Sequence, residues 1–216
     1  MRVLVLRPEP GASETVRKAR ERGLDAVNMP LFEVESVEWQ APDPRDFEGL
    51  LLTSANAPRH AGLEAQALKP LPVYAVGDAT AAAAREAGFT VAQVGSGGVD
   101  QLLASLNPDL RLLHLCGEQH KETEAKQAIT RVIVYRSRAV EAPDLSVAAG
   151  SVALIHSPRA ARRFAELVQE RDSIVIAAIS QAAAEAAGTG WKVIRAADQP
   201  TGEALLALAA SLCNNR

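Results

Sequence analysis

The sequence contains a repeated strand–turn–helix segment, and this repeat restricts the possible folds more than any other feature. LLTSANAP and LIHSPRAA match around Ser54 and Ser157, which are 103 positions apart. VYAVGDATAAAAREAG and VIAAISQAAAEAAG match around Gly77 and Ser180, again 103 positions apart. A constant separation through several matching positions indicates an internal duplication.

A second pair of matching segments precedes these two copies. RVLVLRPE at 2–9 matches RLLHLCGE at 111–118, and each is followed by a longer extended stretch. The chain therefore alternates between two kinds of segment, in the order X1 (1–38), Y1 (47–106), X2 (111–141) and Y2 (151–212). X1 can pack on Y1 and X2 on Y2, or Y1 can pair with X2 while X1 closes onto Y2, and the periodicity leaves both open. Either arrangement gives two similar lobes, and we expect a ligand in a cleft at their junction.

Short apolar runs alternate with Ala-, Leu- and Glu-rich stretches along the chain. The runs predict strands at 2–6, 50–53, 73–76, 112–115, 132–135, 152–155, 174–179 and 193–195. The stretches predict helices at 13–22, 57–67, 79–87, 99–106, 159–170, 181–187 and 202–212. Near-continuous apolar strands that alternate with helices are typical of parallel sheets covered on both faces. We therefore expect an α/β protein with two similar lobes, each a parallel sheet flanked by helices.

Composition and charge exclude several classes of protein. The 216 residues are 48% hydrophobic and 23% charged, which is typical of a globular chain and not of a disordered one. No apolar run is long enough to span a membrane, and the apolar part of the opening MRVLVLRPEP is too short for a signal peptide, so we expect a cytoplasmic protein without a membrane partner. The two cysteines fit a reducing compartment. A net charge of −3 and 4% aromatic residues argue against nucleic-acid binding.

Polar residues and glycines gather where the predicted strands end and the helices begin. The candidate binding residues in these loops are Arg7, Thr53, Ser54, Asn56, Gly77, Thr80, Gly117, Ser157, Arg159 and Ser180. A serine or threonine just before a helix is a natural N-cap, because its oxygen accepts a backbone N–H of the first turn. The alternative is that these hydroxyls and the helix N-termini bind an anion. Because similar residues recur at matching positions of the two copies, the sequence supports both interpretations.

Arginine is concentrated between residues 131 and 163 on an otherwise acidic chain. Guanidinium groups bind carboxylates and phosphates through paired hydrogen bonds, so Arg136, Arg138 and Arg159 are candidates for contacts to a polyanionic small molecule. Tyr135 lies at the end of a predicted strand. Its phenol could donate a proton to a leaving group, although a half-buried tyrosine at a strand end more often has a packing role.

Motifs for metals and cofactors are weak or missing. The glycine-rich VGSGGVD at 94–100 lacks the register of a dinucleotide-binding loop, and the sequence contains no P-loop. His114, Cys116 and His120 could suggest a metal site, but two alternate residues on a buried strand plus one loop histidine are more often explained by packing. We therefore expect no metal and no cofactor.

One ordered set of motifs spans the chain: RVLVLRPEP (2–10), LLTSANA (51–57), VYAVGDATAAAAREAGF (73–89), RLLHLCGE (111–118), VIVYRS (132–137), LIHSPRAARRF (154–164), AAIS (177–180) and Gln199-Pro200-Thr201. The set resembles the uroporphyrinogen-III synthase family. The resemblance implies the second of the two packings, in which residues 1–37 and 142–216 form a discontinuous α/β lobe one and residues 38–141 an inserted α/β lobe two. It also implies a two-stranded linker between the lobes, near residues 35–41 and 138–143.

The resemblance further implies a cofactor-free enzyme of haem biosynthesis. This hydro-lyase cyclises hydroxymethylbilane, a linear tetrapyrrole, to uroporphyrinogen III with loss of water and inversion of the last pyrrole ring. Carried across by position, the family pattern makes Tyr135 the candidate acid. The substrate-facing positions that it implies are Thr53, Ser54, Gly77, Thr80, Gly117 and Ser157. Where many members read glycine-proline-threonine-threonine, this chain has Ser180-Gln181-Ala182-Ala183, so the hydroxyl contacts expected there are missing unless Ser180 supplies one. The segment after Glu118 is short, so contacts from it are not carried over.

A second hypothesis comes from another class, a non-catalytic two-lobed binding protein for a small polyanionic ligand. It shares the repeat and the expected cleft but does not need Tyr135. Such proteins usually carry an export signal or a DNA-binding module, and neither is visible in this sequence. For both hypotheses we expect a monomer whose partner is a small molecule.

Overall fold

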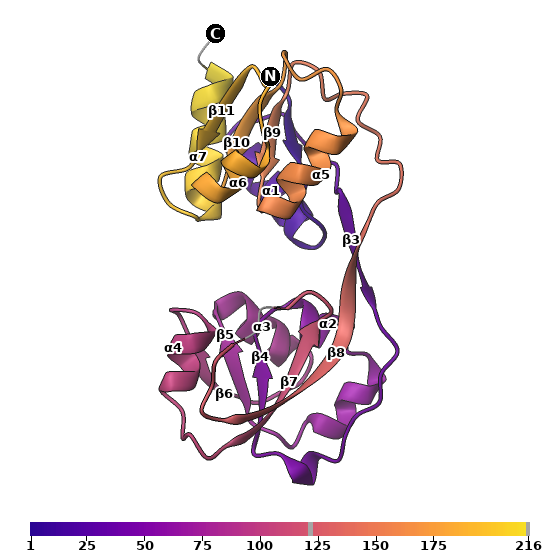
Figure 1. Ribbon diagram of the computed structural model, residues 1–216, viewed down its shortest axis with the longest axis vertical. Coiled ribbons are helices and arrows are strands. Elements are labelled where there is room, and N and C mark those ends of the chain that lie inside the picture. Colours follow the sequence, from indigo (N-terminus) through magenta and orange to yellow (C-terminus); the bar gives the residue numbers. More distant parts are fainter. Residues whose placement is uncertain (121–122, 215–216) are drawn as a thin grey trace. The chain divides into compact units, whose positions relative to one another are not determined.

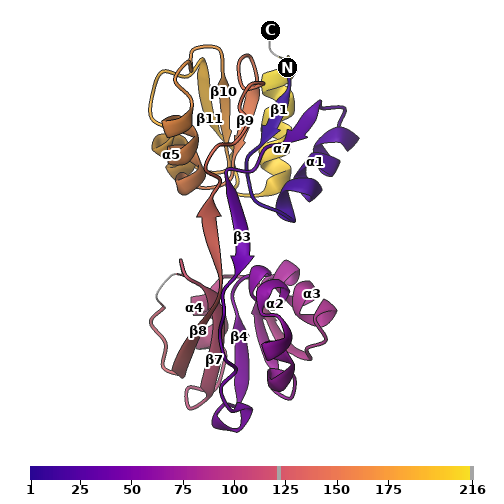
Figure 2. The same ribbon diagram turned by 90° about the vertical axis from the view of Figure 1, so that its right-hand side faces the viewer.

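The computed structural model describes residues 1–120 and 123–214, and the chain forms two compact units. Unit 1 contains Met1–Glu33 and Ala139–Arg216, and unit 2 contains Val34–Arg138 (Figure 1). Two neighbouring strands of one sheet, β3 (Phe32–Ser36) and β8 (Ala128–Ala139), run through the two places where the chain passes between the units. Figure 2 shows these strands side by side, so the connection between the units is two-stranded.

Unit 1 contains a parallel sheet built from both ends of the chain. Its described strands are β1 (Val3–Val5), β2 (Ala26–Asn28), β9 (Val152–Ile155), β10 (Val175–Ala178) and β11 (Val193–Ala196), in the order β11-β10-β9-β1-β2. β1 pairs with β9 in parallel, with Val3 opposite Val152 and Val5 opposite Leu154. Segment X1 therefore shares a sheet with Y2, which is the second of the two packings that the periodicity left open.

Helices cover both faces of this sheet. They are α1 (Gly11–Glu21), α5 (Pro158–Leu167), α6 (Gln181–Ala186) and α7 (Gly202–Asn214). Leu4 and Ile155 point to the face that packs against α5 and α6, whereas Val5 and Leu154 point to the face that packs against α1 and α7. Because alternate strand residues are buried on opposite faces, the strands are apolar throughout, as the sequence pattern predicted.

Unit 2 repeats this arrangement with an additional edge strand. Its remaining strands are β4 (Gly49–Leu52), β5 (Val73–Val76), β6 (Val91–Gly95) and β7 (Arg111–Gly117), and the described sheet has the order β3-β8-β7-β4-β5-β6. The helical elements are η1 (Pro44–Asp46), α2 (Asn56–His60), η2 (Leu63–Leu68), α3 (Asp78–Glu86) and α4 (Val99–Ala104). One face of the sheet packs against α2, η2 and α3, and the other packs against α4.

The order β8-β7-β4-β5-β6 in unit 2 corresponds to β2-β1-β9-β10-β11 in unit 1. The helices α2, α3 and α4 correspond in the same way to α5, α6 and α7. The exception is α1, because no helix is described between β7 and β8, where residues 121–122 of the short segment after Glu118 lie outside the described residues. The two copies of the repeat therefore share a scaffold but differ on the sheet face that α1 covers in unit 1.

The short elements β2, β3 and η1 are absent from the predicted strands and helices, and two further parts of the chain also differ from the prediction. Strand β6 was not predicted, because it lies at the sheet edge with alternating burial and lacks a continuous apolar run. The predicted helix at 57–67 is two elements, α2 and η2, interrupted at Gly62. Gly62 has a φ of +68°, in the left-handed region that glycine adopts without strain, so the α-helix ends before it.

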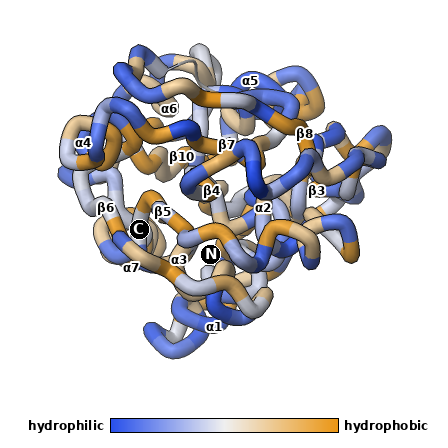
Figure 3. Tube along the Cα trace, turned by 90° about the horizontal axis from the view of Figure 1, so that it is seen from below, coloured by the Kyte–Doolittle hydropathy of each residue, from blue (hydrophilic) through white to orange (hydrophobic). Residues whose placement is uncertain are grey.

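Hydrophobic residues occur in short segments along the chain, and Figure 3 shows them as orange stretches between blue and white ones. The described helix α7 has 13 residues. Within residues 1–120 and 123–214, no helix is both long and apolar enough to cross a membrane.

The shared sheet of unit 1 predicts how fragments of the chain behave. Residues 34–138 retain β4 beside β7 and β5, so we expect this fragment to unfold in one cooperative urea transition. The fragment 1–106 has almost the same length, but it leaves β1 without β9 and β4 without β7. We expect it to show no cooperative transition by circular dichroism. A cooperative transition in 1–106 that is absent from 34–138 contradicts the prediction.

Candidate functional site

The sequence-predicted residues lie at the carboxyl ends of the parallel strands in their own units. In unit 1 they are Arg7 after β1, Ser157 and Arg159 after β9, and Ser180 after β10. In unit 2 they are Thr53, Ser54 and Asn56 after β4, Gly77 and Thr80 after β5, Gly117 at the end of β7, and Tyr135 on β8. Because parallel strands end at one edge of a sheet, each unit gathers its own set at one edge.

Several of the hydroxyls are used locally by the backbone. Ser157 Oγ accepts the N–H of Ala160 at 3.1 Å, and Ser180 Oγ accepts the N–H of Ala183 at 3.3 Å. Ser54 Oγ accepts the N–H two residues further on at 3.2 Å. These bonds confirm the N-cap interpretation for Ser157 and Ser180 and give Ser54 a turn-forming role. Each hydroxyl still has its own proton to donate.

The start of α3 differs from the start of its counterpart α6. Its N-cap is Gly77, which has a φ of +81° and no side chain to cap the first turn. No described atom lies within 4 Å of the place where a Cβ would stand at this glycine. Thr80, in the same turn, is 5% exposed. Where Ser180 closes its helix N-terminus with a hydroxyl, Gly77 leaves the N–H groups of α3 without a side-chain cap.

The ring of Tyr135 lies directly against Gly117. A Cβ at Gly117 would stand 2.6 Å from ring atoms of Tyr135 and 2.9 Å from its phenol oxygen, so only glycine fits this position without moving the ring. The His60 ring lies 6.3 Å from the tyrosine ring, and burial together with Arg59 lowers the pKa of His60. The Tyr135 phenol forms no side-chain hydrogen bond with the residues that the structure describes. The ring is therefore held by packing while its hydroxyl keeps its hydrogen-bonding capacity.

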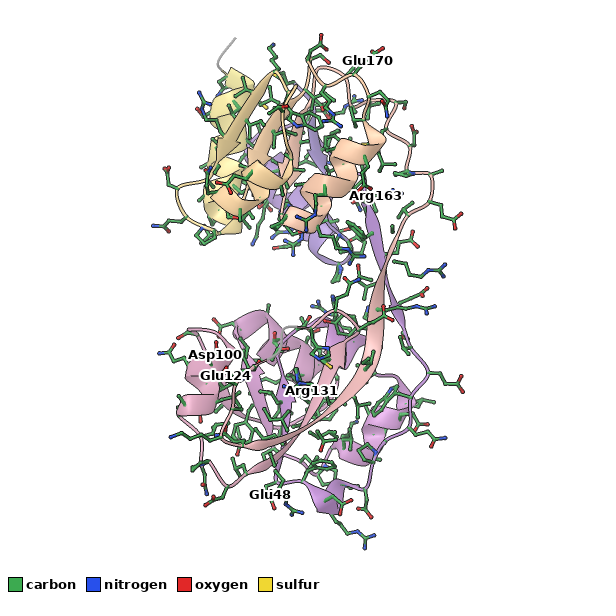
Figure 4. The ribbon with its side chains drawn as sticks, viewed as in Figure 1. Glu48, Asp100, Glu124, Arg131, Arg163 and Glu170 are labelled. Atoms are coloured by element: carbon green, nitrogen blue, oxygen red, sulfur yellow. The ribbon has the colours of Figure 1, made fainter. Side chains whose placement is uncertain are left out.

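His114 contributes to the site, although the sequence indicated only packing for it. Its Nε2 lies 3.0 Å from Thr53 Oγ1, and the residue is 4% exposed. The His120 ring packs against it edge-on at 6.3 Å. Burial, Arg131 (Figure 4) and His120 lower the pKa of His114 to about 4, so the ring is neutral near pH 7. The useful signal was the position of His114 on β7, which pairs with β4 just before Thr53.

Two of the candidate arginines have partners on β3. Arg136 forms an ion pair with Glu35, and Arg138 lies 3.7 Å from the same carboxylate. Arg136 is the main cause of the lowered pKa of Glu35. The guanidinium of Arg159 lies over the Phe32 ring at 4.1 Å. Glu35 therefore pairs with both arginines across the β3–β8 pair, and the expectation that Arg136 and Arg138 bind a ligand stays a prediction.

Arg7 and His156 lie just beyond the carboxyl ends of the adjacent strands β1 and β9 of unit 1. Continuing the β1–β9 pairing two places beyond Val5 sets Arg7 opposite His156. Burial lowers the pKa of Arg7, and burial together with the charge of Arg7 lowers the pKa of His156 to about 4. The sequence analysis selected Arg7 and Ser157 but not His156, because no local pattern shows that the residue before Ser157 comes to lie opposite Arg7.

The two buried histidines predict an acid-sensitive fold. The pKa of His114 and of His156 is about 4 in the folded chain, against 6.5 for an unperturbed histidine. The unfolded chain therefore binds more protons between these values, and the free energy of unfolding falls as the pH falls through this window. We expect a loss of about 2 kcal/mol per histidine between about pH 7 and about pH 5. Urea unfolding at the two pH values measures it.

The variant His114→Gln keeps a polar partner for Thr53 but cannot titrate, so it removes about half of this pH dependence. The contribution of the carboxylates cancels in this comparison, because the wild-type chain and His114→Gln contain the same carboxylates. Equal stability of the wild-type chain at both pH values contradicts the prediction.

The fold and the site define a duplicated α/β protein in which two intertwined units each carry polar residues at the carboxyl ends of a parallel sheet. The family model described as "Uroporphyrinogen-III synthase HemD" matches residues 13–207. Because this match covers most of the chain, the chain belongs to the uroporphyrinogen-III synthase family.

Individual relatives agree with this assignment. A protein of Archaeoglobus fulgidus named "Putative uroporphyrinogen-III synthase" is 37% identical over 81 residues, which are 38% of this chain and 34% of that protein. The aligned segment therefore spans about a third of that relative's length. The crystal structure of uroporphyrinogen-III synthetase from Helicobacter pylori 26695 has the same fold, with a TM-score of 0.71, 19% identity and 98% of each chain covered. A mutant uroporphyrinogen III synthase from the extremely thermophilic bacterium Thermus thermophilus superposes with a TM-score of 0.52 and 18% identity over 100% of both chains.

Proposed function

We propose that the chain catalyses the cyclisation of hydroxymethylbilane to uroporphyrinogen III, as a cyclising lyase of tetrapyrrole biosynthesis. Membership of the family supports the reaction, and the family implies a small tetrapyrrole as the substrate. The structural observation that supports the proposal is the placement of Tyr135. Its ring packs against Gly117, and its hydroxyl forms no side-chain hydrogen bond with the described residues.

In the proposed first step, the Tyr135 phenol donates its proton to the hydroxyl group of the bilane. The C–O bond breaks as the adjacent pyrrole nitrogen supplies electrons, so water leaves and a reactive azafulvenium cation remains beside the phenolate. A proton that the pyrrole releases later restores the phenol. The pyrrole assists its own ionisation, so the protein has to supply a proton donor and a fixed geometry.

The second task is to direct ring closure. Unassisted closure at the free carbon of the last ring gives the isomer without inversion. The inverted isomer requires attack from the substituted carbon through a spiro intermediate, so the substrate has to be held folded while water is excluded. For this role we propose the uncapped first turn of α3 at Gly77 and Thr80, the hydroxyls of Thr53, Ser54, Ser157 and Ser180, and the polar groups of Arg7, Asn56 and Arg159.

The proposal also covers location and assembly. We propose a cytoplasmic monomer in which residues 38–141 form an independently folding inserted lobe between 1–37 and 142–216. The free thiols of Cys116 and Cys213 fit a reducing compartment. Size-exclusion chromatography with light scattering tests the monomer.

Incubation with freshly prepared hydroxymethylbilane tests the reaction. After oxidation, chromatographic separation of the porphyrin isomers should show uroporphyrin III. Uroporphyrin I alone, at the rate found without protein, contradicts the proposed function.

The variant Tyr135→Phe tests the acid directly. It keeps the ring and its packing but removes the donor, so we expect turnover to fall about 10–100-fold while the inverted isomer remains the product. Tyr74→Phe is the matched control, because Tyr74 also packs its ring against a glycine, Gly49, at the sheet of unit 2. Full turnover by a folded Tyr135→Phe protein returns Tyr135 to a packing role.

Gly117→Ala is expected to disturb the same step without removing the phenol. The added methyl group displaces the Tyr135 ring, so turnover falls in the wild-type background but falls little further in a Tyr135→Phe background. Gly202→Ala is the control, because no described atom lies within 4 Å of its Cβ position and it starts α7. Independent, additive losses from the two changes contradict a positioning role for Gly117.

A further inference from the structure

The repeat allows the same edge of the two sheets to be compared position by position. Arg7 corresponds to Cys116 of unit 2, and His156 corresponds to Thr53. In unit 2 the polar side chains of this edge bind each other, because Thr53 Oγ1 lies 3.0 Å from the Nε2 ring nitrogen of His114. Unit 1 has Val5 in place of His114, so no equivalent partner faces His156. The same edge therefore carries a hydrogen-bonded pair in unit 2, Thr53 and His114. In unit 1 it carries Arg7 and His156, which have no side-chain hydrogen bond among the described residues.

Arg7 and His156 have donor and acceptor atoms that form no hydrogen bond with the described residues. Both ring nitrogens of His156 are buried, and neither has a hydrogen-bond partner among the described residues. The Leu154 carbonyl lies near enough to raise the pKa of the ring slightly, but it does not reach normal hydrogen-bond geometry. Arg7 is also largely removed from solvent, and it forms no hydrogen bond or ion pair with any described residue.

The nearest acidic residue of the loop does not neutralise Arg7. The Glu9 carboxylate instead accepts the N–H and the hydroxyl of Ser13 at 3.0 and 2.7 Å, and a bond from Asn28. The guanidinium of Arg7 lies flat against α1, since a Cβ at Gly11 would stand 2.6 Å from each of its Cζ, Nε and Nη2 atoms. Gly11 therefore leaves the room beside α1 that the guanidinium occupies.

A carboxylate satisfies the donors among these atoms, which are the guanidinium N–H groups of Arg7 and the one N–H of the His156 ring. A buried polar atom without a partner and a desolvated cation without an anion both destabilise a fold. The planar guanidinium of Arg7 binds a carboxylate through two parallel hydrogen bonds, and a neutral imidazole has one N–H to donate to the same anion. The geometry points to Arg7 and His156 as a carboxylate-binding subsite of unit 1, with Gly11 as the residue that positions the guanidinium.

The ligand class follows from the proposed function, on which this inference rests. Hydroxymethylbilane carries a carboxylate on every side arm, so the subsite binds one arm of the tetrapyrrole. Uroporphyrin III, the oxidised and stable form of the product, carries the same arms and serves as the probe. Because a side-arm carboxylate does not change during the reaction, this contact contributes to binding in the ground and transition states alike.

Fluorescence titration with uroporphyrin III tests the subsite. Arg7→Gln and His156→Leu are each expected to raise the dissociation constant about 10–100-fold, because each removes hydrogen bonds to a charged group. The dissociation constant of the double variant should rise by less than the product of the two single increases, since both residues bind the same carboxylate. Gly11→Ala should weaken binding with Arg7 still present. With hydroxymethylbilane, the same variants should raise KM and leave kcat unchanged.

Stability separates this role from a structural one. His156→Leu fills the same space with an apolar group and removes two unpaired nitrogens, so the free protein should be as stable as the wild type near pH 7, or more stable. His156→Gln, which keeps an N–H donor, should retain part of the affinity. The charge control is Arg2→Gln, at the other end of β1, where Arg2 pairs with Asp25 at 3.1 Å and both side chains are exposed.

Unchanged affinity in Arg7→Gln and His156→Leu overturns the subsite, and so does a large loss of stability in His156→Leu. If the effects of Arg7→Gln and His156→Leu on the binding free energy are fully additive, the two residues do not bind the same carboxylate. A wild-type chain that binds uroporphyrin III through Arg7 but yields only uroporphyrin I contradicts the proposed reaction and leaves the subsite in place. A wild-type chain that forms uroporphyrin III, with the same KM in every variant, overturns the subsite alone.

Discussion

The parallel pairing of β1 with β9 is the constraint on which the rest of the structure depends. Val3, Val5, Val152 and Leu154 are completely buried at this junction, and the chain must return to the first strand after more than a hundred intervening residues. Burial on both faces makes the pairing favourable, because it removes apolar side chains from water on each side of the sheet. Everything between β3 and β8 consequently forms a unit of its own, joined to the first by two strands.

The same pairing decides where chemistry can take place. Parallel strands end at one edge, so residues far apart in the sequence, such as Arg7 and His156, become neighbours. The duplicated scaffold then allows divergence at matching positions. Ser180 closes the start of α6, whereas Gly77 leaves the start of α3 uncapped, and Thr53 is paired with His114 whereas His156 has no described partner. Repeated backbone geometry with different side chains gives each unit its own set of hydrogen bonds at the strand ends.

The two histidines at these positions lower the stability of the fold in acid. His114 and His156 are both neutral because burial disfavours the charged ring, and each makes the fold sensitive to acid. His156 adds the cost of two buried nitrogens that have no partner among the described residues, which a leucine would avoid. A ligand that accepts a hydrogen bond from the His156 ring would offset part of this cost, which is why residues that destabilise a fold are found at binding sites.

The sequence by itself determined the α/β class, the duplication and nearly all of the elements, because apolar runs and helix periodicity are local patterns. It also singled out most of the polar loop residues, since turns after buried strands carry a recognisable set of side chains. Only the tertiary structure decided which of them have partners. Glu35 binds Arg136, the Tyr135 ring covers Gly117, and His114 reaches Thr53. These contacts join strands that are distant in sequence, and the strand register that creates them depends on packing over both faces of a sheet, which no local pattern encodes.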